Sequence, residues 1–202
     1  MFAVLITFLL VQRIFELILA QRNLRWAREQ GCKESGQWHY PLIVAVHTAF
    51  YLSLVLEYRY LSAGWNPLWP VWLTILGLAQ ALRVWAIVSL GRYWNTRIIV
   101  VPGKKPIRKG PYRWIRHPNY LVVATEILVI PVLCGAYFTA AAFSAINTIV
   151  LYLRIREEER AVASLEGSDL SRLPRFVPKP APCLENSIAR RENPDSPLGG
   201  RR

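Results

Sequence analysis

The chain has few cysteines and none of the common short catalytic motifs, and both absences narrow its chemistry. Its three cysteines are widely spaced and form no C-x-x-C pair, so neither a disulfide framework nor a zinc site is expected. No set of His, Cys, Asp and Glu has metal-site spacing, and no Walker loop or serine-nucleophile motif occurs. The sequence therefore predicts no metal centre.

Acidic residues are also scarce, with 13 Asp and Glu against 25 Lys and Arg and a net charge of +12. In a soluble protein this excess would suggest nucleic acid as a partner. Here the basic residues lie between long apolar blocks, and 53% of the chain is hydrophobic. This layout indicates a membrane protein whose basic loops face lipid headgroups, and no nucleic-acid partner is expected.

Five apolar segments can be drawn, and a spanning helix needs about 20 residues. The last two segments are short and are separated by Cys134-Gly135, which predicts a tight helical hairpin. We therefore predict an all-α integral membrane fold with about five transmembrane helices, the last two a short hairpin, and no Rossmann domain. The five segments cover residues 2–20, 41–61, 68–90, 118–133 and 136–153.

The distribution of basic residues predicts the orientation. Lys and Arg number eight in residues 91–117 and ten in residues 154–202, but only one in residues 57–67. Cytoplasmic loops carry such an excess, so the 91–117 loop and the C-terminus are expected in the cytoplasm and the N-terminus outside. The first segment has no basic leading region, so we interpret it as a retained span rather than a signal peptide.

Three regions follow from this layout. Residues 1–90 are expected to form three transmembrane helices. Residues 91–178 are expected to hold a basic loop, the hairpin and a Glu-rich helix, and a family resemblance of these residues implies that the loop binds a cofactor. Residues 179–202 are polar and are expected to be disordered.

Two polar clusters bracket the hairpin. The first runs from Gly110 to Tyr120 and the second from Arg154 to Arg160. An antiparallel hairpin returns the chain to the side of the membrane that it left. The two clusters should therefore meet at the cytoplasmic end of the hairpin, which we call the mouth.

The residue types at this mouth suit a zwitterionic ligand. Pro118 suits the first turn of a helix, whose free N–H groups attract a carboxylate with help from Arg116. The glutamates at 157–159 can accept hydrogen bonds from an ammonium group or from ribose hydroxyls. The amino-acid end of S-adenosylmethionine fits both sides, as do other zwitterions. Solvated helix ends with simple ion pairs are the alternative interpretation.

These motifs resemble the isoprenylcysteine carboxyl methyltransferase family. The resemblance covers roughly residues 10–178. Within the family, the chain is similar to a small bacterial branch, some of whose members are associated with O-methylation of alkylpyrones and alkylresorcinols. The motifs that carry it are Leu90-Gly91-Arg92-Tyr93, Gly110-x-Tyr112, Arg116-His117-Pro118-x-Tyr120 and Arg154-Ile155-x-x-Glu158-Glu159.

The resemblance implies a membrane methyltransferase that uses S-adenosylmethionine at the cytoplasmic face of a bacterial membrane. Arg154 would lie near the ionised oxygen of the acceptor, and Glu158, four residues further on the same helix face, is the candidate base. Val122 replaces a glycine expected there and is predicted to narrow the pocket or shift the helix start. The cofactor-binding residues would be Tyr112, Arg116, His117, Pro118, Tyr120, Glu158 and Glu159.

Several alternatives stay open from the sequence. His117-Pro118-Asn119-Tyr120 is also compatible with NADPH-dependent sterol or steroid reductases, and a non-enzymatic membrane scaffold is a further possibility. The acceptor that the resemblance implies is lipophilic or prenylated: a prenylcysteine carboxylate, an alkylpyrone or alkylresorcinol hydroxyl, or a lipid amine. The sequence does not fix the oligomeric state.

Charged residues also occur inside the spans, where charge is costly. Arg13 and Glu16 are three residues apart and are expected to pair on one helix face. Arg83 and Glu126 are expected to pair across helices or to bind the acceptor. His47 is interpreted as a hydrogen-bonded packing residue.

Overall fold

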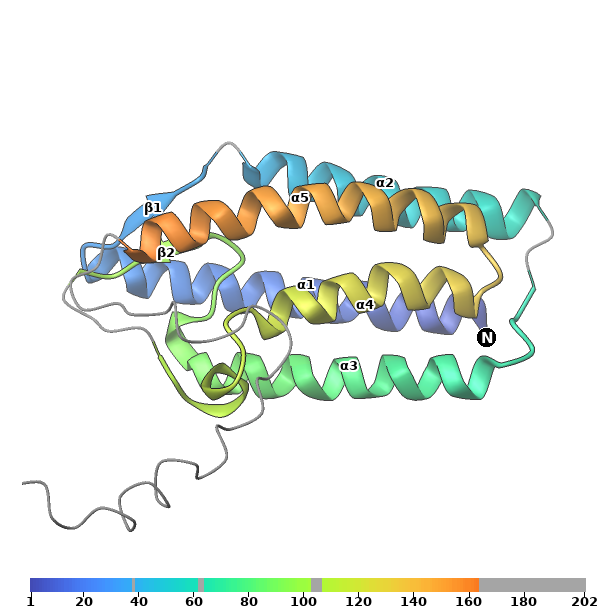
Figure 1. Cartoon of the computed structure of the whole chain (residues 1–202), viewed down its shortest axis with the longest axis horizontal. Helices are drawn as coiled ribbons and strands as arrows, with labels where there is room; N and C mark the ends of the chain where they lie inside the picture. Colours follow the sequence, from blue (N-terminus) through green and yellow to red (C-terminus); the bar gives the residue numbers. More distant parts are fainter. Residues whose placement is uncertain (38, 62–63, 103–106, 164–202) are drawn as a thin grey trace, which may run out of the picture.

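The computed structural model describes residues 1–37, 39–61, 64–102 and 107–163. Within this part of the chain, five α-helices run along the longest axis of the molecule, and successive helices point in opposite directions (Figure 1). They are α1 (Phe2–Glu29), α2 (His39–Tyr60), α3 (Trp69–Leu90), α4 (Pro118–Leu133) and α5 (Tyr137–Ala163). The predictions for residues 164–202, including the disordered tail, lie outside the described residues.

The outer faces of these helices are apolar. Phe15, Val88 and Ile149 are each more than 60% exposed, although side chains of this kind are normally buried in water-soluble proteins. Four helices, α1, α2, α3 and α5, are long and apolar enough to cross a membrane, and α4 is a shorter apolar helix. The predicted all-α integral membrane fold is confirmed.

The hairpin differs from its prediction in the length of its second helix. Helix α4 has 16 residues, but α5 has 27 and runs to Ala163 instead of ending near Leu153. The cluster from Arg154 to Arg160 therefore belongs to α5 itself. Arg, Glu and Ala are strong helix formers, so the helix continues past its apolar part. For the same reason α1 continues to Glu29.

The turn of the hairpin is fixed by polar contacts at the end of the bundle that also holds the N-terminus (Figure 1). The carboxylate of Glu57, at the end of α2, accepts hydrogen bonds from the backbone N–H groups of Phe138 (3.0 Å) and Thr139 (2.7 Å). These groups at the start of α5 have no partner within the helix, so Glu57 acts as a cap supplied by another helix. This contact fixes the position at which α5 begins relative to α2.

The opposite end of the bundle, which we call the loop end, holds the remaining elements (Figure 1). Strand β1 (Lys33–Ser35) pairs antiparallel with β2 (Ile98–Val100), with Glu34 opposite Ile99. Two short 3-10 helices, η1 (Gly91–Tyr93) and η2 (Gly110–Arg113), follow α3 and precede α4. This small sheet was not predicted, because its two strands are three residues long and far apart in the sequence.

Candidate active site

The two polar clusters meet at the loop end, as predicted. His117, the residue before α4, faces α5: its Nδ1 atom is 3.7 Å from Glu158 Oε2 and its Nε2 atom is 3.4 Å from Glu159 Oε1. Arg116 Nη1 lies 2.9 Å from the same Glu159 oxygen. Pro118 occupies the first turn of α4, where its missing N–H group costs no hydrogen bond.

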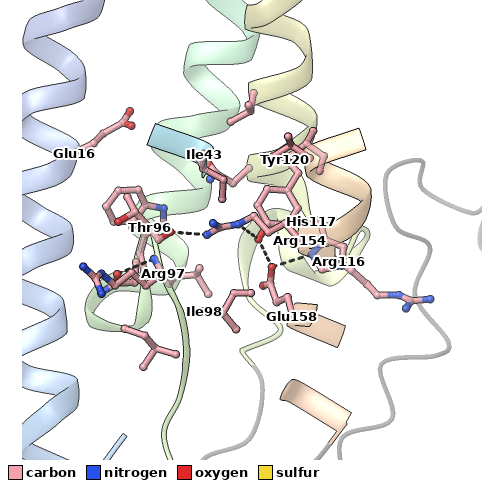
Figure 2. Close-up of a pocket in the computed structure, with 18 of the residues that line it drawn as sticks. Glu16, Ile43, Thr96, Arg97, Ile98, Arg116, His117, Tyr120, Arg154 and Glu158 are labelled. Carbon is pink, nitrogen blue, oxygen red and sulfur yellow. Dashed lines mark hydrogen bonds and ion pairs between the residues drawn. The ribbon is translucent and has the colours of Figure 1, made fainter. Parts of the chain in front are cut away.

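A hydrogen-bonded chain continues inward from this mouth. Figure 2 shows the Tyr120 hydroxyl between Glu158 and Arg154. The hydroxyl donates to Glu158 Oε2 and accepts a hydrogen bond from Arg154 Nε at 2.7 Å. The ring of Tyr120 stacks on His117, with 5.3 Å between centroids. Arg154 and Glu158 thus share one helix face, as predicted, and Tyr120 connects them.

The wall opposite α5 comes from the segment between η1 and β2. Arg154 Nη2 donates to the Thr96 carbonyl oxygen at 2.5 Å. Asn23 on α1 holds this segment and η1 in place, because its amide donates to the carbonyl oxygens of Trp94 (2.7 Å), in the segment, and of Gly91 (3.2 Å), the first residue of η1. Sequence reasoning missed this wall. Asn23 gave no clear signal in the sequence, because it stands between Arg22 and Arg25 in a polar stretch of α1.

These groups surround one cavity of about 220 Å³. It runs from the mouth at His117 and Glu158 to Arg13 and Glu16 on α1 and His47 on α2. Six of the predicted site residues line it: Tyr112, Arg116, His117, Tyr120, Arg154 and Glu158. Pro118 and Glu159 adjoin the mouth without lining the cavity.

Val122 does not face the cavity. Its side chain is 1% exposed and packs in the bundle, while the next residue, Val123, lines the cavity. The Val122 side chain therefore does not itself narrow the cavity.

Two residues that line the cavity each have a buried polar atom without a hydrogen-bond partner within the described part of the chain. These atoms are the indole Nε1 of Trp94 and the amide Oδ1 of Asn119. One donates and the other accepts, and leaving such buried groups unpaired costs roughly 1–3 kcal/mol each. A ligand with both donors and acceptors would satisfy them. S-adenosylmethionine has such groups, so the residues present fit this cofactor.

Tyr112 contributes a hydroxyl group to the cavity lining. Burial raises the pKa of its phenol above the ordinary value, and the negative charge of Glu158 adds to this effect. Tyr112 therefore stays protonated at neutral pH. Among the residues that the structure describes, no group of three His, Cys, Asp or Glu could hold a metal ion.

The inner end of the cavity adjoins a buried network of charges. Arg13 pairs with Glu16 (2.8 Å), as predicted, and also with Glu126 (2.6 Å). Arg83 pairs with Glu126, as predicted, and also with Glu16 (2.9 Å). The two predicted pairs are therefore one network across α1, α3 and α4, in which two positive charges face two negative charges.

Comparison with known proteins identifies the family. The sequence profile of the isoprenylcysteine carboxyl methyltransferase (ICMT) family matches residues 72–164, which contain every predicted site residue. The chain belongs to the ICMT family. Its members are membrane methyltransferases, and the matched segment runs from α3 to the end of α5.

Related proteins extend the similarity beyond this segment. The uncharacterized protein YpbQ of Bacillus subtilis (strain 168) is 44% identical over 162 residues, which cover 80% of this chain and 96% of YpbQ. An uncharacterized protein of Haemophilus influenzae is 27% identical over 78% of this chain and 92% of its own length. The protein-S-isoprenylcysteine O-methyltransferase of Xenopus laevis is 26% identical over 56% of this chain and 42% of the frog protein.

Proposed function

We propose that this ICMT-family protein uses S-adenosylmethionine to methylate an oxygen of a lipophilic acceptor at the cytoplasmic face of a bacterial membrane. The observation that carries the proposal is the continuous cavity that joins the His117–Glu158 mouth to an inner end among apolar helices. A water-soluble, zwitterionic donor suits the mouth, and an acceptor from the bilayer suits the inner end.

The mouth offers complementary groups for the amino-acid part of the cofactor. The first turn of α4 and the Arg116 guanidinium attract its carboxylate, while Glu158 and Glu159 attract its ammonium group. Tyr112 and Tyr120 add hydroxyl groups and aromatic faces beside a cation. His117 and Pro118 set where α4 begins and so where these groups lie. The indole N–H of Trp94 and the amide oxygen of Asn119, which have no partners within the described residues, add a donor and an acceptor.

The residues promote the transfer mainly by position and charge. S-adenosylmethionine, when bound, would supply a methyl group attached to a positively charged sulfur, and loss of that group leaves a neutral thioether. Near-attack alignment of the two reactants is worth roughly 7–11 kcal/mol. Arg154 is fixed from both sides by Tyr120 and Thr96, so its charge can hold an acceptor oxygen in one place. A carboxylate arrives ionised, whereas a phenol or enol must lose a proton, for which Glu158 was the candidate from the sequence.

The surroundings suit a membrane-dissolved acceptor. The apolar part of the cavity wall includes Ile43 on α2, Val123 on α4 and Leu151 on α5. An acceptor with a long apolar tail can enter sideways between helices while its polar head reaches the cavity. Genomic neighbours bear on its identity, because an adjacent polyketide synthase would favour a phenol or pyrone.

Ligand-dependent thermal unfolding of the detergent-purified protein tests this proposal. A ligand that binds the native state at 100 times its Kd stabilises it by about 2.7 kcal/mol, so S-adenosylmethionine should raise the Tm. Substitutions His117→Ala and Glu158→Ala should remove this rise. Glu157→Ala, in the same helix turn, should preserve it and is the matched control, because Glu157 pairs with Arg160 and does not line the cavity. A Tm that responds to NADPH and not to S-adenosylmethionine would refute the proposal in favour of a reductase.

A further inference from the structure

His47 on α2 lines the inner part of the cavity, and its two ring nitrogens have different surroundings. Nδ1 lies 2.8 Å from the carbonyl oxygen of Ile43, one turn earlier in the same helix. A carbonyl oxygen only accepts, so Nδ1 must carry the hydrogen. In a neutral imidazole the other nitrogen, Nε2, then holds a lone pair. Within the described residues Nε2 has no hydrogen-bond partner. A packing role alone does not require a basic nitrogen at a cavity wall.

The charges around His47 are already balanced. The titratable and charged groups near it come from three other helices and from α2 itself, while α5 contributes the neutral Asn147 to the same cavity. Arg13 and Arg83 each contact both carboxylates of the network. Neither arginine of this network therefore has an uncompensated positive charge that would bind an anionic acceptor at the inner end of the cavity. A neutral hydroxyl group is the acceptor that this environment suits. The groups are Arg13, Glu16, Tyr51, Arg83 and Glu126.

Glu158 is less well placed for the same task. Its Oε2 atom already accepts the hydroxyl hydrogen of Tyr120 and lies near His117 at the mouth. His47 is seven residues along α2 from Tyr40, whose ring holds Arg97 at the loop end. Seven helical residues span roughly 10 Å. His47 is therefore deeper in the bundle, on the side from which a membrane-dissolved acceptor arrives.

From these observations we propose that His47 Nε2 is the general base that removes the proton of a phenolic or enolic hydroxyl on the acceptor. This inference rests on the proposed function and adds its base and its acceptor class. The acceptor O–H bond breaks and its proton passes to His47 Nε2. The oxygen uses its electron pair to form the bond to the methyl carbon, and the pair of the broken carbon–sulfur bond stays on the donor sulfur. His47 releases the proton to water after the product leaves.

The decisive variant is His47→Asn. The Asn amide keeps a donor near the position of Nδ1, toward the Ile43 carbonyl, but has no basic nitrogen. General base catalysis contributes roughly 10²–10⁴-fold, so kcat toward a long-chain alkylresorcinol should fall by at least about 10²-fold. Turnover of a farnesylcysteine carboxylate, if the enzyme accepts it, should change little, because that oxygen is already ionised. Thr48→Val, an exposed neighbour whose hydroxyl bonds only the Val44 carbonyl, is the matched control.

Two further readouts separate a base from a structural role. In the wild type, kcat/KM for the resorcinol should fall as the pH decreases and His47 becomes protonated, and this acid limb should be missing in His47→Asn. Second, a long-chain 4-alkyl-2-nitrophenol should bind the wild type, without any methyl donor, with an increased phenolate absorbance. The variant should bind the same probe without that increase.

The outcomes distinguish this inference from the proposed function. If His47→Asn methylates the resorcinol at the wild-type rate, or if the nitrophenol gives the same spectrum in both proteins, His47 is not the base while the methyltransferase assignment stands. If the wild type methylates only carboxylates, the acceptor class proposed here is wrong. If the wild type neither binds S-adenosylmethionine nor transfers its methyl group, the proposed function itself fails.

Discussion

Arg154 and Tyr120 are joined by a hydrogen bond of 2.7 Å from the guanidinium Nε to the phenol oxygen. The guanidinium carbon also lies 5.5 Å from the centre of the Tyr120 ring. Tyr120 belongs to α4 and Arg154 to α5, so this contact ties the two helices of the hairpin together where the candidate site lies. The same hydroxyl donates to Glu158, so one oxygen atom orients both residues.

We expect Tyr120→Phe to weaken cofactor binding. The substitution keeps the ring but removes the hydroxyl that orients Arg154 and Glu158. Hydrogen bonds to charged groups are worth about 1.5–3 kcal/mol, so the Kd for S-adenosylmethionine should rise about 10- to 100-fold. Isothermal titration calorimetry measures this change. Tyr152→Phe, on the exposed side of α5, is the control and should leave the Kd unaltered. Equal affinities of Tyr120→Phe and the wild type would show that this hydroxyl does not organise the site.

The buried charge network gives a prediction about stability. The side chains of Arg83 and Glu126 are 1% and 4% exposed. Removing one partner of a buried pair leaves the other charge uncompensated and costs roughly 3–5 kcal/mol. Glu126→Gln should therefore lower the free energy of unfolding in detergent by this amount. Glu157→Gln, which breaks the exposed pair with Arg160, should cost about 0–1 kcal/mol. Similar losses in the two variants would mean that the inner network contributes no more than a surface pair.

The sequence predicts most of the membrane architecture because span length and loop charge are local signals. The meeting of His117 with Glu158 was also predictable, since a hairpin geometrically requires it. The length of α5 was missed because hydropathy marks where apolar residues stop and not where the helix ends. The wall at Thr96 was missed for a different reason. Its position depends on Asn23 and on the pairing of two short strands about 65 residues apart, which no local pattern encodes.

Asn23 provides a test of that wall. Asn23→Ala removes the hydrogen bond to Trp94, in the segment between η1 and β2, and the one to Gly91 in η1, while an alanine fits a helix well. We expect this segment to exchange amide hydrogens faster and the Kd for S-adenosylmethionine to rise, with the rest of the bundle unaffected. Hydrogen exchange followed by mass spectrometry reports on residues 94–100 directly. Arg22→Ala, at the neighbouring exposed position of α1, is the control. Unchanged exchange in Asn23→Ala would show that other contacts hold the wall.

Gly110 controls how the chain enters the site from η2. Its φ angle is +54°, and a Cβ atom there would lie 1.9 Å from Ser89 Oγ and 3.0 Å from Trp85 Nε1 on α3. A left-handed conformation costs a non-glycine residue roughly 1–2 kcal/mol even without a clash.

Gly110→Ala should therefore displace η2, which carries Tyr112, and should weaken S-adenosylmethionine binding more than it lowers the Tm of the protein without ligand. The control is Gly77→Ala in the interior of α3, where an added Cβ meets nothing within 4 Å. Because alanine is favoured over glycine in a helix by roughly 0.5–1 kcal/mol, that variant should be at least as stable as the wild type and should bind the cofactor normally. Thermal unfolding of each variant with and without S-adenosylmethionine checks both expectations. A Gly110→Ala protein with the full ligand-induced rise in Tm would show that the approach of η2 to α3 does not position the site.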